Sequence, residues 1–302
     1  MPTFHTALTV FATEVTTKFG LLIDAQEEEQ LKSPVEQLLR AAGDLLTLDV
    51  KTVGETRAET KGRPDVGVAK DRLLVGYVEL KAPGKGADTR KFRGHDKQQW
   101  EKFKDIPNIL YTDGNEWALY HNGKLTEKLI RLPGNITTDG TNAVDTEAAS
   151  ALFELLRNFL QWEPISPASP KNLAEMLAPV CRLLRKDVLA ALEDPLSNLS
   201  TLAQDWRSAL FPDADNKQFA DAYAQTLTYA LLLARLSGES ELTVSEAARS
   251  LRKGHQLLAE ALKVLGDDDA REQIEMPVRL IERLIGAVSK ERLTRNLSLI
   301  HI

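Results

Sequence analysis

The chain has 302 residues, of which 43% are hydrophobic, and a formal net charge of −6. This length and composition suffice for one large core or two ordinary ones, and the net charge excludes a protein that is basic throughout. Its one cysteine, Cys181, excludes an intramolecular disulfide scaffold and is expected in a helical core. The scattered histidines exclude an evident zinc site, and no P-loop is present.

The first predicted element is a helix that starts near Ser33. The segment Ser33-Pro34-Val35-Glu36 has the pattern of a capping box with proline at the first helical position. Glu36 is therefore expected to close the start of this helix.

Two strands with unusual charges follow this helix. Pro64-Asp65 lies on one of them, and the next runs from Leu73 to Lys81 with Glu79 and Lys81 near its end. With a period of two, one face of that strand carries Val75, Tyr77, Glu79 and Lys81. Buried charges are unfavourable unless they are paired or hold a metal. Two carboxylates beside a lysine suit a Mg²⁺-dependent cleavage of a phosphodiester.

A basic segment follows this strand. Residues 81–104 contain eight Lys or Arg against three acids, and they include several glycines. A local basic patch beside a pair of acids suits a polyanionic partner, although such a run can also be a solvated face. We expect contacts to the DNA backbone from Lys85, Arg90, Lys91, Arg93 and Lys97.

The rest of the chain changes from strands to helices. Strands are predicted at 109–112 and 117–121, and Asn122-Gly123 indicates a hairpin before Leu125–Leu132. Apolar stripes at helical spacing begin at residue 152 and recur almost to the end of the chain. The sequence therefore predicts a domain at 1–133, a linker at 134–150 and a helical domain at 151–302.

The pattern Pro64-Asp65 … Glu79-Leu80-Lys81 resembles the signature of PD-(D/E)XK nucleases. The string GRPDVGVAKDRLLVGYVELKAPGKG resembles Mrr-like nuclease modules at the N-terminus of single-chain restriction-modification enzymes (type IIG or type ISP-like). In those enzymes an adenine-specific DNA methyltransferase follows. The resemblance covers roughly residues 30 to 130 and implies an α/β restriction-endonuclease-like core, with a mixed sheet flanked by helices, followed by an all-α connector.

The resemblance implies an endonuclease that hydrolyses DNA phosphodiesters by a metal-activated water, with Mg²⁺ as cofactor and Mn²⁺ as a substitute. Asp65 and Glu79 would bind the metal with Glu36 as a third acid, and Lys81 would stabilise the reacting charges. Gln99 matches the family's QxxxY element, in which Phe103 replaces the tyrosine here. It would orient water or a phosphate, or it is a solvated helix residue.

The implied partners are double-stranded DNA and a methyltransferase or target-recognition domain in cis or in trans. S-adenosylmethionine would bind only through such a domain, and the chain would be the front of a longer protein. Two alternatives stay open: a surface ion pair at Asp65, Glu79 and Lys81, and an inactive DNA-binding or regulatory portion of an adenine-specific methyltransferase. No signal peptide or spanning segment is evident, so we expect a cytoplasmic protein without membrane contact.

Overall fold

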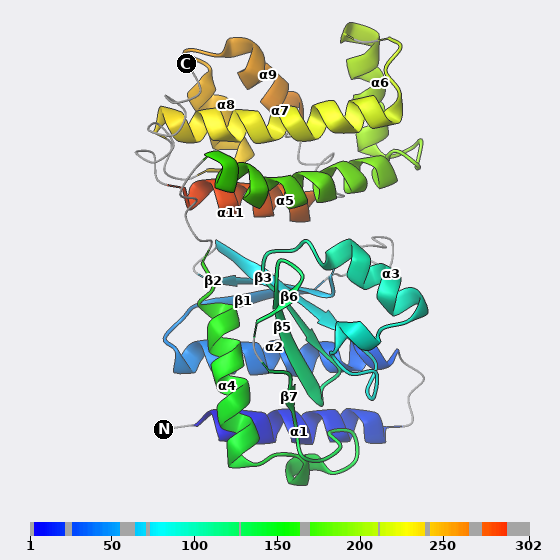
Figure 1. Ribbon diagram of the computed structural model, residues 1–302, viewed down its shortest axis with the longest axis vertical. Coiled ribbons are helices and arrows are strands. Elements are labelled where there is room, and N and C mark those ends of the chain that lie inside the picture. The colour runs from blue at the N-terminus through cyan, green and yellow to red at the C-terminus, as the bar shows by residue number, and fades with distance from the viewer. Residues whose placement is uncertain are drawn as a thin grey trace. The chain divides into compact units, whose positions relative to one another are not determined.

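The computed structural model describes residues 3–21, 26–54, 64–70, 73–126, 128–163, 170–210, 212–238, 242–265 and 274–288. The chain forms two compact units, Met1–Glu163 and Pro164–Ile302. The first unit is α/β with a mixed sheet, and the described part of the second is helical (Figure 1). The predicted fold class, a sheet flanked by helices followed by a helical region, is confirmed.

The first unit contains the strands and the helices that cover them. Its elements in chain order are α1 (Phe4–Gly20), α2 (Glu27–Leu45), β1 (Val50–Gly54), β2 (Val66–Lys70), β3 (Leu73–Leu80), η1 (Thr89–Lys91), α3 (Gly94–Phe103), β4 (Ile109–Thr112), β5 (Glu116–His121), β6 (Lys124–Leu125), β7 (Ile130–Arg131), η2 (Gly140–Ala143) and α4 (Thr146–Leu160).

The described strands form one sheet in the order β1-β2-β3-β4-β5-β6, and β7 also pairs with β5. Among the described strands, β3 and β4 are the one parallel pair, and the chain crosses between them through η1 and α3. The hairpin between β5 and β6 is at Asn122-Gly123, where both residues have positive φ angles of 49° and 77°. These angles match the type I′ turn that this dipeptide favours, and the predicted hairpin is confirmed.

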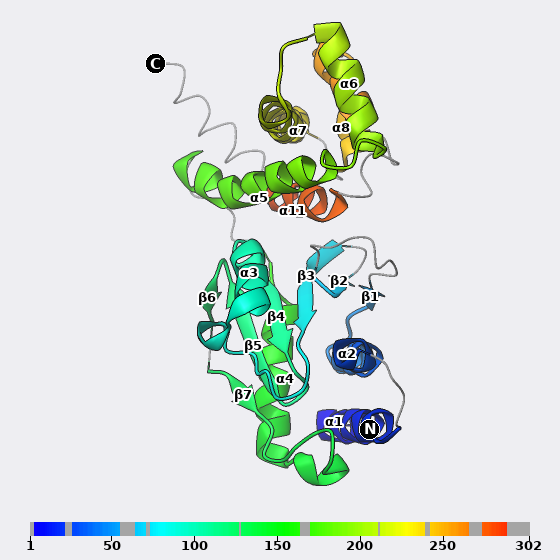
Figure 2. The same ribbon diagram turned by 90° about the vertical axis from the view of Figure 1, so that its right-hand side faces the viewer.

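The sheet separates two layers. One face packs on α1, α2 and α4 through a core that includes Val78, Leu80, Leu110 and Trp117. The opposite face carries Tyr77, Glu79, Tyr111 and Tyr120, and α3 lies on this side (Figure 2). Trp100 of α3 contacts Tyr111 and Tyr120 edge-on or tilted. The predicted alternation along β3 is thus confirmed, and Glu79 belongs to the α3 face.

The end of the first unit differs from the predicted domain boundary at residue 133. The helix α4 was assigned by sequence to the helical domain, but its residues Leu152, Leu156 and Phe159 lie in the core of the first unit. Asn108 Nδ2 donates to the carbonyl oxygens of Val75 and Phe159, which ties α4 to the sheet. A Cβ at Gly76 would lie 2.4 Å from Asn108 O, so only glycine permits this close approach.

The segment 134–150 is packed onto the first unit, although its polar composition predicted a linker. Ile136 and Ala143 are fully buried, and Ile136 bonds through its backbone to the side chains of Thr16 and Asn115. The strand predicted from Leu125 to Leu132 is present only as the short strands β6 and β7. Tertiary contacts therefore hold a segment that has few apolar residues of its own.

The helix start predicted near Ser33 is wrong. The helix α2 begins at Glu27, and Ser33 and Pro34 lie in its interior. The acids Glu27, Glu28 and Glu29 occupy its first turn, where negative charge interacts favourably with the helix dipole. Farther along, a buried apolar stripe compensates for the backbone hydrogen bond that Pro34 cannot make.

The described elements of the second unit are all helical. They are α5 (Pro170–Ala191), α6 (Asn198–Leu210), α7 (Asn216–Ser237), α8 (Val244–Leu251), α9 (Gln256–Leu265) and α11 (Glu275–Gly286). The long helix α7 packs against α5, and there Cys181 Sγ lies 3.2 Å from Thr228 Oγ1. Partial burial raises the pKa of this thiol, and Cys181 lies at the border of the helical core instead of inside it. Within the described residues, no helix is long and apolar enough to cross a membrane.

Candidate active site

The strand register brings the charges of the motif to one edge of the sheet. Because Val66 pairs with Val78 in the antiparallel pair β2–β3, Asp65 and Glu79 follow at the next opposed positions and share the α3 face. Asp65 Oδ2 accepts a 2.7 Å hydrogen bond from the Leu80 N–H, which fixes its carboxylate at this edge. Gly62 and Arg63, which precede the motif, lie outside the described residues.

Lys81 is buried at the same edge and has several partners. Its Nζ donates to Glu79 Oε1 at 2.7 Å and to Gln99 Oε1 at 2.6 Å, and Asp96 Oδ1 lies 3.9 Å away. Glu79 and Lys81 are each only 1% exposed. The half-buried Gln99 is thus directed by α3 onto the ammonium group of Lys81, a contact that the sequence did not predict.

Burial makes the two carboxylates unfavourable as anions. The pKa of Asp65 rises from 3.8 to about 6, chiefly through burial, against the opposing Leu80 hydrogen bond and Lys81 charge. Burial and then the charge of Asp65 raise the pKa of Glu79 well above its ordinary range, although Lys81 opposes the rise. Glu79 Oε2 accepts no hydrogen bond from any described residue. The positive charge of Lys81 is therefore not enough to stabilise both carboxylates as anions.

The third acid near this pair is Glu28, and the structure does not bring Glu36 to the pair. Glu28 Oε1 accepts a 3.2 Å hydrogen bond from the Ala82 N–H, and its charge contributes to the raised pKa of both Asp65 and Glu79. Glu36 lies eight residues farther along α2, about 12 Å at the helical rise, and pairs with Arg40 at 3.1 Å. The acidic run at the start of α2 was the sequence feature that could have indicated Glu28.

The donor set at this edge fits a hard divalent cation. The described residues contain no group of three or more Asp, Glu, His or Cys side chains arranged to hold a metal on their own. Mg²⁺, however, is usually held by one or two carboxylates together with waters and substrate phosphates. Two neighbouring carboxylates, of which Asp65 raises the pKa of Glu79, are suitable ligands, and Glu79 Oε2 is a buried oxygen without a described partner.

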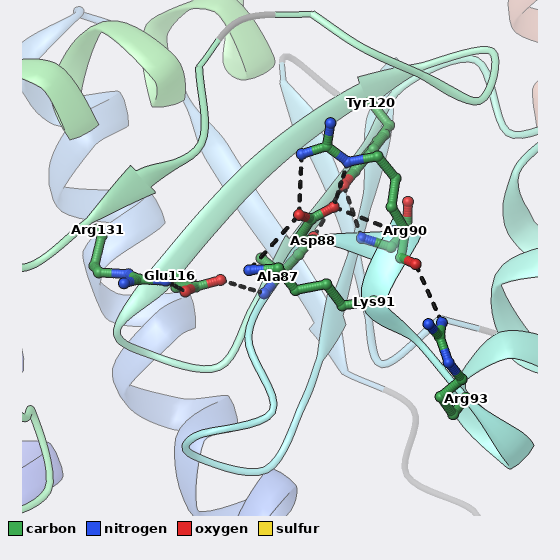
Figure 3. A network of polar contacts seen from close by, with 9 residues as sticks. Ala87, Asp88, Arg90, Lys91, Arg93, Glu116, Tyr120 and Arg131 are labelled. Atoms are coloured by element: carbon green, nitrogen blue, oxygen red, sulfur yellow. Dashed lines mark hydrogen bonds and ion pairs between the residues drawn. The ribbon is translucent and has the colours of Figure 1, made fainter.

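The five predicted DNA contacts, Lys85, Arg90, Lys91, Arg93 and Lys97, are all exposed. They lie on the connection from β3 to α3 and on α3 itself. Arg90 and Lys91 share the carboxylate of Asp88 (Figure 3). Two other cations of the basic run are less available, since Lys81 is buried and Lys104 pairs with Glu101. The patch is thus smaller than the sequence suggested.

The connection from β3 to α3 is held in place by hydrogen bonds to Asp113. Asp113, directly after β4, accepts hydrogen bonds from the N–H groups of Gly84 and Gly86 at its Oδ2 and from two further N–H groups at its Oδ1. Neither Asp113 nor Asp88 has a sequence pattern that points to this role. Only the folded sheet, which places the end of β4 beside this connection, gives them partners.

Comparison with known proteins adds little to this geometry. No family model matches the chain, and no curated protein matches it. Six chains of solved structures match. One, described as "cryoEM structure DrdV-DNA complex", is 15% identical with a TM-score of 0.35, over 96% of this chain and 28% of its own. At that level of similarity it does not bear on the chemistry of the site.

Proposed function

We propose that the chain is a metal-dependent nuclease that hydrolyses the phosphodiester bonds of double-stranded DNA. The observation that carries this proposal is the burial of Glu79 and Lys81 at one sheet edge beside the half-buried Asp65, with Glu79 Oε2 lacking a described partner. An exposed ion pair would need neither the burial nor the second acid. The restriction-modification setting and an adenine-specific methyltransferase partner rest on the motif resemblance alone.

Each residue has a distinct role in this mechanism. Asp65 and Glu79 would hold the cation, with Glu28 beside them. A bound cation would acidify water and offset the charge of the phosphate. Lys81 would offer its ammonium to the attacking water or to a phosphate oxygen, and Gln99, which accepts a hydrogen bond from it, would hold that ammonium in place. The oxygen of the attacking water would bond to phosphorus as that water gives up a proton to solvent. The ester P–O bond would break, and the leaving oxygen would take up a proton from solvent.

The 2.7 Å hydrogen bond between Lys81 and Glu79 favours one alternative. In an inactive DNA-binding or regulatory module, this pair would simply neutralise itself. DNA binding by such a module would not depend on a divalent cation, and removing either partner would affect stability but no cleavage.

Cleavage of supercoiled plasmid DNA in Mg²⁺ or Mn²⁺ separates the two proposals. We expect nicking that a chelator abolishes, that Asp65→Asn eliminates, and that Lys81→Met slows about 10²- to 10³-fold. Lys51→Met is the matched control, because Lys51 lies on β1 with its partner Asp49, outside the site. Nicking that survives the chelator or both site substitutions contradicts the nuclease proposal.

A further inference from the structure

Arg90 is bound by a carboxylate that the nuclease mechanism does not use. Its Nε donates to Asp88 Oδ1 at 2.8 Å and its Nη2 donates to Asp88 Oδ2 at 3.0 Å, which is a two-point, fork-to-fork contact. Figure 3 shows the guanidinium folded over Asp88 from the same short segment. The contact fixes the plane of the guanidinium as well as its position.

The base of this contact is rigid. The backbone on either side of Asp88 is bonded to the sheet, because Tyr120 Oη donates to Ala87 O at 3.0 Å and accepts from the Thr89 N–H at 3.1 Å. The Ala87 N–H also donates to Glu116 Oε2, and Glu116 in turn pairs with Arg131. The side chain of Asp88 is only 9% exposed, whereas that of Arg90 is 78% exposed. Asp88 is thus held in place by the surrounding hydrogen bonds, and Arg90, which it binds, faces the solvent.

The hydrogen-bond geometry leaves one edge of Arg90 available. A guanidinium has five N–H donors, and the fork to Asp88 uses one on Nε and one on Nη2. The edge formed by Nη1 and the outer N–H of Nη2 can therefore meet a phosphate while the contact to Asp88 persists. A lysine at this position could not make both contacts in a fixed plane.

We propose that Asp88 is a positioning residue that holds Arg90 as a preorganised contact for a phosphate of the DNA backbone. This inference rests on the proposed function in that the ligand is duplex DNA, but it does not require cleavage. Preorganisation lowers the entropy that a flexible arginine loses on binding. Asp88 therefore increases DNA affinity although it carries the same sign of charge as the phosphate.

The sign of one substitution tests this inference. The Asp88→Asn variant keeps an oxygen that can accept the backbone N–H of Arg90, as Asp88 Oδ1 does. Its amide nitrogen, however, cannot accept the second hydrogen bond from the guanidinium, which Asp88 Oδ2 accepts from Arg90 Nη2. Glu101→Gln is the matched control, since Glu101 lies in the same basic run and also pairs with a cation, Lys104. Both variants lose one negative charge, so simple electrostatics predicts tighter DNA binding for both.

Binding of the full chain to a fluorescein-labelled 20-base-pair duplex is measured by anisotropy in Ca²⁺, with thermal melting to verify folding. We expect Asp88→Asn to weaken binding about two- to tenfold, and Glu101→Gln not to weaken it. Arg90→Ala lowers the slope of log affinity against log salt by about 1. In the Arg90→Ala background, Asp88→Asn should no longer weaken binding.

Two outcomes overturn the inference and differ in what they imply for the nuclease proposal. If the unaltered chain binds the duplex and Asp88→Asn binds as tightly or more tightly, Asp88 does not position Arg90, while the proposed nuclease function stands. If the unaltered chain shows no binding to the duplex, both the inference and the proposed function fail.

Discussion

Replacing Asp65 by Asn should stabilise the first unit when no divalent cation is present. Burial holds the pKa of Asp65 at about 6 in the folded state. Ionisation of Asp65 at higher pH therefore lowers the free energy of unfolding. Asparagine keeps an oxygen that can accept the Leu80 N–H, and it removes the charge that raises the pKa of Glu79. The substitution therefore relieves an unfavourable charge without losing the local hydrogen bond.

The size and sign of the effect follow from the pKa values. Between pH 3.8 and about 6 the folded state binds more protons at Asp65 than the unfolded state does, so stability falls as the pH rises through this window. At about 1.4 kcal/mol for each pKa unit, the full penalty above pH 6 is about 3 kcal/mol. Near pH 5 it is about half of that. Asp65→Asn should recover this amount at most.

Urea unfolding followed by tryptophan fluorescence measures the difference at pH 8 and pH 5 in the presence of a chelator. Three of the four tryptophans, Trp100, Trp117 and Trp162, belong to the first unit, so the signal mainly reports its unfolding. Addition of Mg²⁺ should stabilise the unaltered chain and should affect the Asp65→Asn variant much less.

The matched control is Asp113→Asn, which should have the opposite sign. Both oxygens of Asp113 accept backbone N–H groups, and an amide would place donors against donors. We expect a loss of about 1.5–3 kcal/mol. If Asp65→Asn also destabilises at pH 8, then the charge of Asp65 is a stabilising partner of Lys81, and the interpretation of this edge as a cation site is refuted.

Three further predictions concern the same site. Glu28→Gln should weaken Mn²⁺ binding about 10-fold or more in calorimetry. Glu36→Gln should leave Mn²⁺ binding unchanged, because Glu36 pairs with Arg40. Equal effects of the two substitutions would contradict the assignment of Glu28 to the site. Cation binding should release protons and weaken below about pH 6, since Asp65 has a pKa of about 6 and burial raises that of Glu79. Calorimetry in buffers of different ionisation enthalpy measures this proton release. If no protons are released, both acids are already ionised before the cation binds. Gln99→Ala should lower the maximal cleavage rate with little change in DNA affinity, because Gln99 acts through Lys81; a variant that loses only DNA affinity would instead place Gln99 at the nucleic acid.

The sequence predicts the central strands and their charged edge because both depend on short-range patterns. Alternation along Leu73–Lys81 identifies the face that carries Glu79 and Lys81, and β3 ends within one residue of the prediction. An antiparallel neighbour that starts directly after Asp65 must place this acid at the same edge. The exact partner of Asp65 could not be predicted in this way, because the register shifts by one residue between Val68 and Ala69 and so brings Asp65 opposite Glu79 instead of Val78.

The neighbours of that edge could not be predicted in this way. Ser33 to Glu36 matches a local helix start, but the buried stripe of α2 extends the helix to Glu27 and brings Glu28 to Ala82. The contact between Gln99 and Lys81 depends on how α3 folds back across the sheet, 18 residues along the chain. In each case a tertiary contact decides which of several similar polar residues reaches the site.

The burial of Lys81 and Glu79 is itself an argument for chemistry at this edge. A buried ion pair is often no more stabilising than hydrophobic residues of similar volume, because both charges lose their hydration. The rest of this face offers suitable neighbours, since Tyr77, Tyr111 and Phe103 are buried there. Leucine at both positions would satisfy the fold, and it would also avoid a buried carboxylate oxygen without a described partner. Stability therefore gives little reason for the two acids and the lysine, whereas the proposed binding of a cation and a phosphate would use all three.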